Sequence, residues 1–167
     1  MATEADFDFS AKVIMAGGAA ARANWERLKQ HTVAEWSGDL DATMATMTKN
    51  GTFQIMHATG LDIRGWDEVK EFYRRRMQTF SGQGFFAHRW VASDEVIVGQ
   101  GYFDGRPNGV FFGTPTSGKH IILPMSIWIY FEDGLVKGEA AYCDGAELAR
   151  QIREGAPAGL TVKTPLY

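Results

Sequence analysis

Three histidines and one aspartate are the side chains of this 167-residue sequence that are best suited to proton transfer. The unperturbed pKa of a histidine, ~6.5, suits proton transfer near neutral pH. A carboxyl group in a mostly apolar cavity has a raised pKa, so it can take a proton from a carbon next to a carbonyl group and return it elsewhere. We therefore expect the catalytic groups of this chain to be His31, His57, His88 and Asp144.

Each of these side chains also has a purely structural interpretation. The string Asp144-Gly145-Ala146-Glu147 is a capping-box pattern, which places Asp144 at the N-cap and Glu147 at the third position of a helix. Capping and catalysis are compatible only if one oxygen of Asp144 remains free toward a cavity. A lone histidine among aromatic side chains is usually a packed core group, and this interpretation is open for all three histidines.

The sequence predicts no metal and no cofactor. The three histidines come from separate predicted elements and form no His-x-His or Glu-x-x-His pair, so only convergence in the fold, with Asp144 as a further ligand, could make a site. Cys143 is the single cysteine, which excludes a cysteine cluster and an intrachain disulfide. The segment 113–119, GTPTSGK, lacks the glycine spacing of a phosphate loop.

Composition favours a protein that binds a small apolar molecule. Aromatic residues make up 13% of the chain, with eleven Phe, five Trp and five Tyr, which is more than packing alone requires. The net charge of −3 gives no basic footprint for nucleic acid. The cluster Arg74-Arg75-Arg76 fits the end of a helix, where cations favour the helix dipole, or binding of an anionic group.

No apolar run approaches the ~20 residues of a membrane helix, and the first residues do not resemble a signal peptide. We therefore expect a cytoplasmic protein without membrane contact.

Hydrophobic periodicity predicts helices in the first half of the chain. Trp25, Leu28, Thr32 and Trp36 recur at helical spacing within a helix over 20–36. A second helix follows the cap at 37–39, a strand covers 51–57, and a third helix covers 66–80. His57 is expected on the same strand face as Phe53.

Strands are predicted after residue 80, over 85–92, 95–103, 119–131 and 135–143. Asp133-Gly134 indicates a hairpin between the last two, and a final helix follows Asp144. Helices followed by antiparallel strands are typical of an α+β domain. We expect an N-terminal arm at 1–19 containing a short helix, one domain at 20–154, and an extended C-terminal tail at 155–167.

The strand 119–131 divides into an apolar odd-numbered face and a mixed even-numbered face. The even face is exposed, forms a dimer contact or lines a cavity. Pro124 cannot donate a backbone hydrogen bond, which indicates an edge position or a bulge. Combining this face with the other aromatic stripes, we expect the substrate-binding residues to be Trp36, Phe53, Tyr73, Phe86, Trp90, Trp128, Tyr130 and Tyr142.

Four strings in the chain resemble the nuclear-transport-factor-2-like superfamily, and above all its SnoaL-like polyketide cyclase branch. Together they cover roughly residues 22–154 and read EWSGDLDATMATMTKNGTF, IRGWDEVKEFY, GVFFGTPTSGK and FEDGLVKGEAAYCDGAELARQI. The resemblance implies a cone-shaped domain, in which a strongly curved antiparallel sheet wraps around the N-terminal helices and encloses a cavity. It also implies a homodimer through the outer face of the sheet.

The resemblance also implies roles for particular residues. SnoaL-like cyclases use an aspartate near the end of the last strand as general acid–base, and Asp144 is similarly placed. In ketosteroid isomerase a tyrosine seven residues before a Gly-Asp turn donates to the substrate oxyanion, and here His31 lies seven before Gly38. The catalytic aspartate of that isomerase has no counterpart in Ile55-Met56-His57, so His57 is a candidate substitute base.

The sequence therefore predicts a cofactor-independent lyase, isomerase or cyclase. It would act by proton transfer on a hydrophobic aromatic or polycyclic carbonyl or hydroxyl compound. The alternative is a non-catalytic protein of the same fold that binds a small molecule or serves as a dimerisation module.

Overall fold

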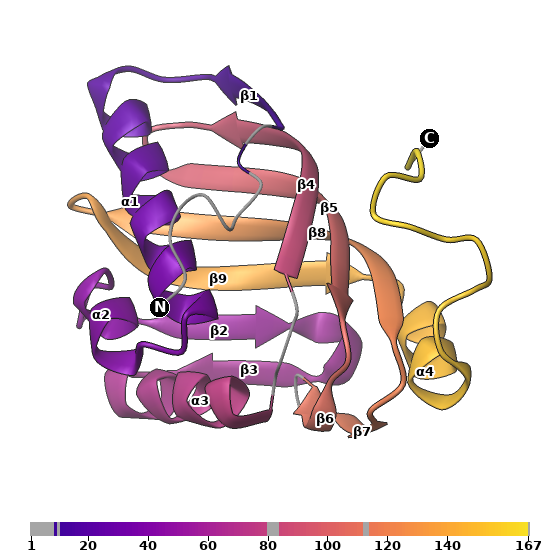
Figure 1. Cartoon of the computed structure of the whole chain (residues 1–167). Helices are drawn as coiled ribbons and strands as arrows, with labels where there is room; N and C mark the ends of the chain where they lie inside the picture. Colours follow the sequence, from indigo (N-terminus) through magenta and orange to yellow (C-terminus); the bar gives the residue numbers. More distant parts are fainter. Residues whose placement is uncertain (1–8, 10, 80–83, 112–113, 167) are drawn as a thin grey trace.

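The computed structural model describes residues 9, 11–79, 84–111 and 114–166, and its centre is a seven-stranded sheet (Figure 1). The strands lie across the sheet in the order β1-β4-β5-β8-β9-β2-β3. The pairs β1–β4 and β2–β9 are parallel, and the other neighbours are antiparallel. The strands are β1 Lys12–Met15, β2 Phe53–Met56, β3 Leu61–Arg64, β4 Gly84–Ala92, β5 Val96–Gly105, β8 Ile121–Glu132 and β9 Leu135–Cys143.

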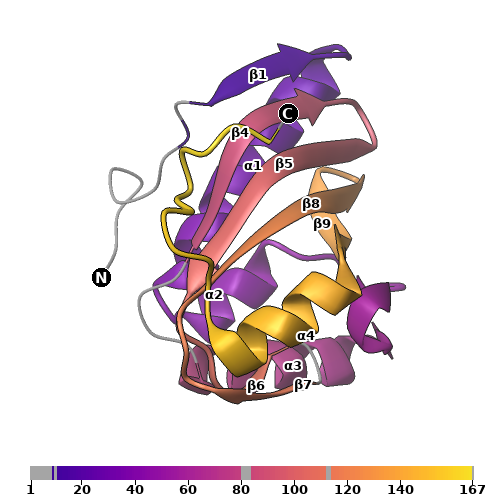
Figure 2. The ribbon, with the colours of Figure 1, turned by 90° about the vertical axis from the view of Figure 1, so that its right-hand side faces the viewer.

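The helices of the described residues are divided between one face and one end of this sheet. Figure 1 shows α1 crossing in front of the sheet, with α2 and α3 near its lower edge, and Figure 2 shows α4 beside the strands. A separate two-stranded sheet, β6 Asn108–Phe111 and β7 Thr114–Ser117, completes the fold. The helices are α1 Ala19–Trp36, α2 Leu40–Ala45, the 3-10 helix η2 His57–Thr59, α3 Trp66–Thr79 and α4 Gly145–Glu154. None of them is long and apolar enough to cross a lipid bilayer.

The hairpin between β8 and β9 confirms the turn predicted from its sequence. Asp133 and Gly134 both have positive φ, 52° and 74°, which is the backbone of a tight two-residue hairpin turn. Downstream, β9 pairs with β8 on one side and with β2 on the other, so it lies inside the sheet. A side chain in the middle of β9 is therefore flanked by strands on both sides.

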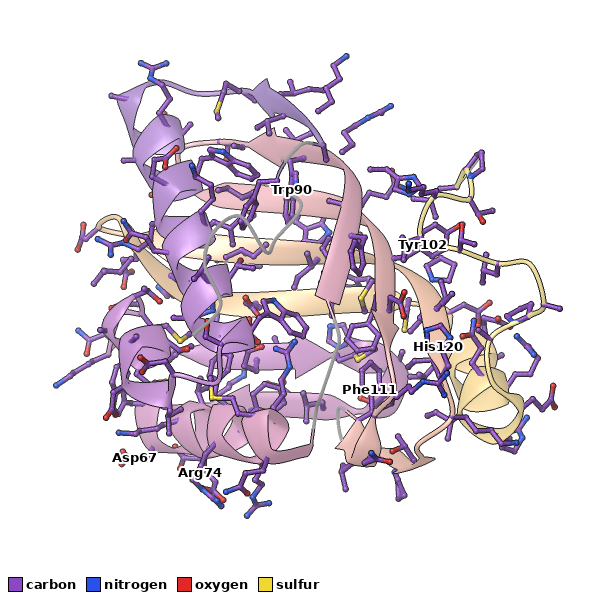
Figure 3. All side chains as sticks on the ribbon, in the orientation of Figure 1. Asp67, Arg74, Trp90, Tyr102, Phe111 and His120 are labelled. Carbon is purple, nitrogen blue, oxygen red and sulfur yellow. The ribbon has the colours of Figure 1, made fainter. Side chains whose placement is uncertain are left out.

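The core lies between α1 and the face of the sheet that α1 covers. Trp25 and Leu28 of α1 pack in one cluster with Trp90 of β4 and Ile129 of β8. This arrangement confirms the predicted helical stripe and the apolar odd-numbered face of β8. Figure 3 shows Trp90 within this interior, whereas Asp67 and Arg74 of α3 project from the outer surface.

Pro124 lies inside the sheet order but beyond the end of one partner strand. It pairs with Tyr102 of β5, whereas the pairing of β8 with β9 begins at Met125 and Cys143. Pro124 therefore has no partner residue on β9, as expected for a residue that lacks a backbone N–H group. The register shift between β8 and β9 falls later, between Tyr130 and Phe131.

Three local expectations differ from the structure. The N-terminal arm contains β1, paired in parallel with β4, and no helix among its described residues. His57 does not continue β2, because η2 begins there and turns at Gly60, whose φ of 74° suits glycine. Leu61–Arg64, which connects the strand predicted over 51–57 to the helix predicted over 66–80, was expected to contain no element of its own and forms β3, which pairs with β2. The expected end of the third helix, Phe80, lies outside the described residues.

The C-terminal segment, residues 155–166, contains turns and lies along the outer side of the sheet (Figure 2). Ala156 donates its backbone N–H to the carbonyl of His120 over 2.8 Å. The Nε2 atom of His88 lies 2.6 Å from the carbonyl oxygen of Val162. The expectation of an extended, loosely held tail is therefore replaced by a segment that is tied to the sheet at two points.

Candidate active site

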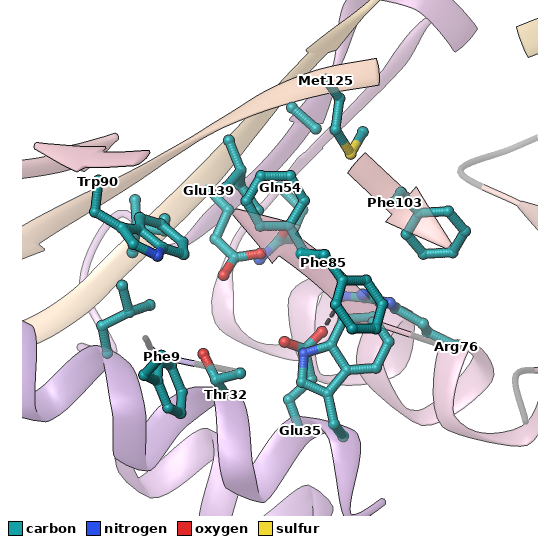
Figure 4. Close-up of a pocket in the computed structure, with 17 residues that line it drawn as sticks. Phe9, Thr32, Glu35, Gln54, Arg76, Phe85, Trp90, Phe103, Met125 and Glu139 are labelled. Atoms are coloured by element: carbon teal, nitrogen blue, oxygen red, sulfur yellow. Dashed lines mark hydrogen bonds and ion pairs between the residues drawn. The ribbon is translucent and has the colours of Figure 1, made fainter. Parts of the chain in front are cut away.

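A cavity of about 120 Å³ lies between α1, α3 and the inner face of the sheet (Figure 4). Much of its wall is apolar and comes from α1, β4 and β8, including Leu28, Trp36, Phe85, Trp90, Ile127 and Ile129. A smaller set of polar side chains also faces it, namely Thr32, Glu35, Gln54, Arg76 and Glu139. An apolar cavity with a few converging polar groups is the usual form of a small-molecule site.

Two carboxylates and a guanidinium converge on this cavity from three different elements. Glu35 lies near the end of α1, and Arg76 of α3 donates to its carboxylate. The guanidinium of Arg76 also stacks 4.7 Å from the ring centre of Trp36. Glu139 projects from the middle of β9, and its side chain is 7% exposed. A buried charge is tolerated only when it is paired, and here each carboxylate faces a cation or a potential cation.

His31 lies beneath the cavity and connects Glu139 to α2. It is one helical turn before Glu35 on α1 and is completely buried. Its Nδ1 atom is 2.6 Å from the hydroxyl of Thr46, and its Nε2 atom is 3.5 Å from Glu139 Oε1. The hydroxyl of Thr46 donates its only proton to the carbonyl oxygen of Thr43. The Nδ1 atom of His31 must therefore carry a proton and donate it to Thr46.

Tyr73 and Gln54 complete the buried network. Gln54 donates its amide N–H to the hydroxyl of Tyr73 over 2.7 Å, and that hydroxyl lies 3.2 Å from His31 Nε2. Gln54 is the register partner of Glu139 in the parallel pair β2–β9, so their side chains lie on the same face. Burial raises the pKa of the Tyr73 phenol well above its usual value, so Tyr73 is neutral and able to donate.

The two carboxyl groups have pKa values shifted in opposite directions. Burial raises the pKa of Glu35, Arg76 opposes that shift, and the charge of Glu139 adds to it, with a net increase. Burial also acts to raise the pKa of Glu139, but the hydrogen bond and charge of His31 outweigh it, so this pKa is lowered. Adjacent carboxyl groups that differ in this way are typical of acid–base pairs.

The pKa of His31 is raised. Burial alone would lower it, but the hydrogen bond and the charge of Glu139 more than compensate. His31 and Glu139 therefore favour an ion pair.

His31, Glu35 and Glu139 are also close enough to be considered as metal ligands. Their nearest ligand atoms all lie within 4.8 Å of one another. Arg76 already neutralises Glu35, however, and an imidazolium at His31 neutralises Glu139. A divalent cation would add charge to a balanced cluster and compete with the Arg76 guanidinium, so the donor set fits proton transfer better than metal binding.

Four of the residues expected to bind substrate, and His31 of the expected catalytic residues, lie at or directly behind this cavity. Trp36, Phe86 and Trp90 line it directly. Tyr73 and His31 belong to the hydrogen-bonded network behind its polar wall. These five come from α1, α3 and β4, which the sequence could not place relative to one another.

The other aromatic residues expected at the site lie on the opposite face of the sheet. Trp128 and Tyr142 are 37% and 41% exposed, and their rings are 6.3 Å apart. Phe53 contacts Tyr130 at 5.5 Å over the backbone of Gly138. These four, which we call the outer aromatic face, do not line the cavity, because side chains alternate along a strand and Ile127 and Ile129 take the inner positions.

The remaining acid–base candidates also lie away from the cavity. His57 is exposed and its ring centre is 5.9 Å from that of Tyr142 on the outer aromatic face. His88 contacts Tyr102 and Val162 beneath the C-terminal segment. The carboxylate of Asp144 accepts from the N–H groups of Ala146 and Glu147, so it caps α4.

The charged residues of the cavity are not among those predicted from the sequence. Glu35 adjoins Trp36 of the predicted stripe, and Arg76 belongs to a cluster read as a helix end. Glu139 offered the clearest signal, because it is a single carboxylate in the middle of a strand that the hairpin pattern had already predicted. Gln54 and Thr32 gave no signal beyond their position on a predicted strand and helix.

Comparison with known proteins identifies similarity at the level of family and fold. The family model of the SnoaL-like polyketide cyclases matches residues 26–152. None of the curated proteins matches the chain.

Solved structures resemble this one over most of their length. A protein from Jannaschia sp. CCS1 described as a SnoaL-like polyketide cyclase is 21% identical, with a TM-score of 0.68 over 84% of this chain and 96% of that one. A protein from Catenulispora acidiphila with a ketosteroid isomerase-like fold, in complex with trimethylamine, is 14% identical, with a TM-score of 0.61 over 81% of this chain and 97% of that one. TerC, crystallised with polyporic acid, is 14% identical, with a TM-score of 0.61 over 79% and 99%. At these identities the likeness establishes the nuclear-transport-factor-2-like fold.

Proposed function

Because this chain belongs to the SnoaL-like polyketide cyclase family, we propose that it is a cofactor-independent enzyme that transfers a proton on a small carbonyl compound. Family and fold support a cyclase or isomerase type of role. The observation that carries the finer proposal is the pair Glu35 and Glu139, which face one apolar cavity with pKa values shifted in opposite directions. These two residues differ from the catalytic residues expected from the sequence, which were Asp144 and three histidines.

In the proposed reaction Glu35 is the general base. Its raised pKa brings its proton affinity closer to neutral pH, where a base is most effective. Glu35 takes a proton from the carbon next to the substrate carbonyl, and the electron pair of the broken C–H bond moves onto the carbonyl oxygen as an enolate. Return of the proton to another carbon completes an isomerisation. In a cyclisation the enolate carbon instead attacks a second carbonyl carbon of the same molecule, the π electron pair of that C=O bond moves onto its oxygen, and Glu35 returns the proton there.

Glu139, His31 and Arg76 have supporting roles in this proposal. His31 holds Glu139 ionised, and the charge of Glu139 raises the proton affinity of Glu35. Arg76 stacks on the ring of Trp36 and positions the carboxylate of Glu35 by donating a hydrogen bond to it. A lyase step would use the same groups, with the enolate expelling a leaving group from the adjacent carbon.

The volume of the cavity limits the size of the substrate. A dry cavity of ~150 Å³ is known to hold benzene, and this cavity has about 120 Å³. We therefore propose a substrate with a single ring, or of comparable size, in place of a polycyclic compound. Of the similar structures, one is a complex with trimethylamine and another was crystallised with polyporic acid, which supports ligand binding by this fold.

Exchange of hydrogen for deuterium tests the proposal without knowledge of the natural substrate. Cyclohexanone is incubated with the protein in D2O, and deuterium incorporation next to its carbonyl is followed by NMR. We expect catalysed exchange that falls by about a hundredfold or more in Glu35→Gln, the scale of a lost general base. Glu26→Gln on the exposed side of α1 is the matched control and should exchange like the wild type.

Two results would count against this function. Exchange that is equal in wild type and Glu35→Gln would remove Glu35 as the base. Cyclohexanone binding without any catalysed exchange would favour the alternative, a binding protein of the same fold.

We also propose that two copies of the chain associate through the outer aromatic face. The resemblance of the sequence to its family implies such a homodimer. The proposal is supported by exposed Trp128 and Tyr142, since clustered exposed aromatic side chains are typical of protein interfaces.

A further inference from the structure

One buried polar atom at the cavity has no hydrogen-bond partner among the residues that the structure describes. It is the indole nitrogen Nε1 of Trp90. Trp90 is 6% exposed and its ring lines the cavity. Buried N–H groups in native proteins are nearly always paired, and leaving one unpaired costs ~1–3 kcal/mol. An unpaired donor in a cavity wall therefore calls for an acceptor from outside the chain.

The packing of Trp90 fixes which edge of its ring faces inward. Gly99 is the register partner of Trp90 on β5. A Cβ atom at Gly99 would lie 2.4 Å from Cζ3, 2.7 Å from Cη2 and 2.8 Å from Cε3 of Trp90. The benzo edge of the indole therefore rests on the bare backbone of Gly99. Nε1 lies on the other long edge of the ring, which is turned from the sheet toward the interior (Figure 4).

The neighbouring side chains do not satisfy this N–H group. Trp25 and Phe85 meet the Trp90 ring nearly edge-on, with ring centres at 5.5 and 5.7 Å. Phenylalanine has no acceptor atom and the indole nitrogen of tryptophan is only a donor. Thr32 and Glu35, the polar side chains that α1 offers to the cavity, make no hydrogen bond to the indole nitrogen of Trp90. Thr32 lies across the interior from Trp90 in Figure 4.

We propose that Trp90 is a specificity-determining residue whose N–H binds an uncharged acceptor oxygen, a ketone or similar carbonyl, of the cavity ligand. This inference rests on the proposed function for the identity of the cavity as the substrate site. The ligand is uncharged because Arg76 and His31 already neutralise Glu35 and Glu139, so a charged ligand of either sign would bring an unpaired charge into the cavity. A carbonyl oxygen is an acceptor only, which matches the single donor offered.

This placement also orients the ligand for proton transfer. A donor aimed at a carbonyl oxygen becomes a stronger partner as negative charge develops there, so Trp90 stabilises the enolate more than the ketone. With the oxygen at Trp90, the adjacent C–H groups lie in the remainder of a small cavity that Glu35 and Glu139 share.

A matched pair of ligands tests the hydrogen bond by itself. Cyclohexanone and methylenecyclohexane have the same heavy-atom skeleton and differ in C=O against C=CH2. Dissociation constants are measured by NMR titration for the wild type, Trp90→Phe and Trp25→Phe. Trp25 packs against Trp90 but is not in the cavity wall, so Trp25→Phe controls for the loss of an indole from the same cluster.

We expect Trp90→Phe to weaken the binding of cyclohexanone about five- to tenfold, which corresponds to the loss of one buried hydrogen bond. The binding of methylenecyclohexane should weaken by less than about twofold. Trp25→Phe should change the dissociation constants of both ligands by the same factor. Equal weakening of both ligands by Trp90→Phe, or failure of the wild type to bind cyclohexanone up to its solubility, would overturn the inference.

A second measurement does not depend on a stable variant. In ¹⁵N-labelled wild-type protein, the indole N–H resonance of Trp90 should move downfield on addition of cyclohexanone and stay in place with methylenecyclohexane. Identical responses to both ligands would also overturn the inference. Binding with the expected Trp90 dependence but no deuterium exchange would refute the proposed enzyme and leave this site intact. Exchange that does not depend on Trp90 would refute only the inference.

Discussion

At the scale of single residues, the protonation of His31 is set by hydrogen bonds on both sides of its ring. The hydroxyl of Thr46 must accept from Nδ1, because its own proton goes to the carbonyl of Thr43. A proton on Nε2 as well completes the imidazolium that Glu139 favours. Thr46 is therefore a positioning residue, which fixes the ring with Nε2 toward Glu139 and the hydroxyl of Tyr73.

This ion pair predicts how stability depends on pH. The folded chain holds the His31 proton more tightly than the unfolded chain, whose pKa is 6.5, so the contribution of His31 to the free energy of unfolding is complete below pH 6.5 and is lost as pH rises through the folded pKa. The lowered pKa of Glu139 affects stability at the acidic end of the pH range. Its contribution is present above pH 4.5 and is lost as pH falls through the folded pKa.

We therefore expect the free energy of unfolding, measured by urea denaturation, to decrease with pH above 6.5 in the wild type. Glu139→Gln should flatten this decrease, because the carboxylate that raises the pKa of His31 is then absent and burial alone lowers that pKa. Glu26→Gln, which removes a carboxylate from an exposed pair on the same helix as His31, should keep the slope. A slope that persists unchanged in Glu139→Gln would contradict the assigned pair.

At the scale of elements, Asp144 shows how one residue serves the end of a helix. Its carboxylate accepts from two N–H groups of the first turn of α4, at 2.8 and 3.2 Å. The helix in turn presents Gln151, which exchanges hydrogen bonds with the backbone of Ile122 in β8. The cap therefore supports the contact that joins α4 to the sheet.

Replacement of this cap should affect stability and spare the chemistry. We expect Asp144→Ala to lower the free energy of unfolding by about 1 kcal/mol, the usual value of an N-cap side chain. Asp144→Asn, which can still cap, should lose much less. Deuterium exchange into cyclohexanone, normalised to folded protein, should be unchanged in both variants. A large loss of exchange in Asp144→Asn would instead support the catalytic role expected from the sequence.

At the scale of the whole molecule, the two faces of the sheet have different tasks. The inner face packs on α1 and carries the cavity, whereas the outer aromatic face is left uncovered on β8, β9 and β2. The C-terminal segment covers a different part of the outer face, near His88 and Tyr102. Figure 3 shows Tyr102 and His120 on the side of the molecule where this segment lies.

We expect a dimer in solution, with twice the 18.5 kDa mass of one chain by light scattering. Trp128→Arg places a charge in the proposed interface and should shift the protein toward the monomer. Val110→Arg is the control, because Val110 is 52% exposed on β6, away from the outer aromatic face. A wild type that remains monomeric at high concentration would refute the homodimer.

The sequence by itself determined the family and most of the long helices and strands, although not β1, η2 or β3. The helical stripe of α1, the Asp-Gly hairpin and the alternating faces of β8 and β9 are local patterns, and local sterics and burial are enough to produce them. Their order predicted an α+β domain, and the resemblance of four strings to the SnoaL-like branch implied the cone fold. The domain boundaries remain predictions, although β1 adds part of the N-terminal arm to the sheet.

Only the tertiary structure decided which charged residues belong to the site. Periodicity tells which face a side chain occupies but not what covers that face, so the sequence did not single out Glu35 or Glu139 and left Arg76 in a cluster that could be a helix end or bind an anionic group. They become a site because α1, α3 and β9 bring them together under apolar cover, where burial shifts their pKa values and pairing makes the charges tolerable. The unpaired N–H of Trp90 is likewise a property of packing, and no pattern of residues along the chain encodes it.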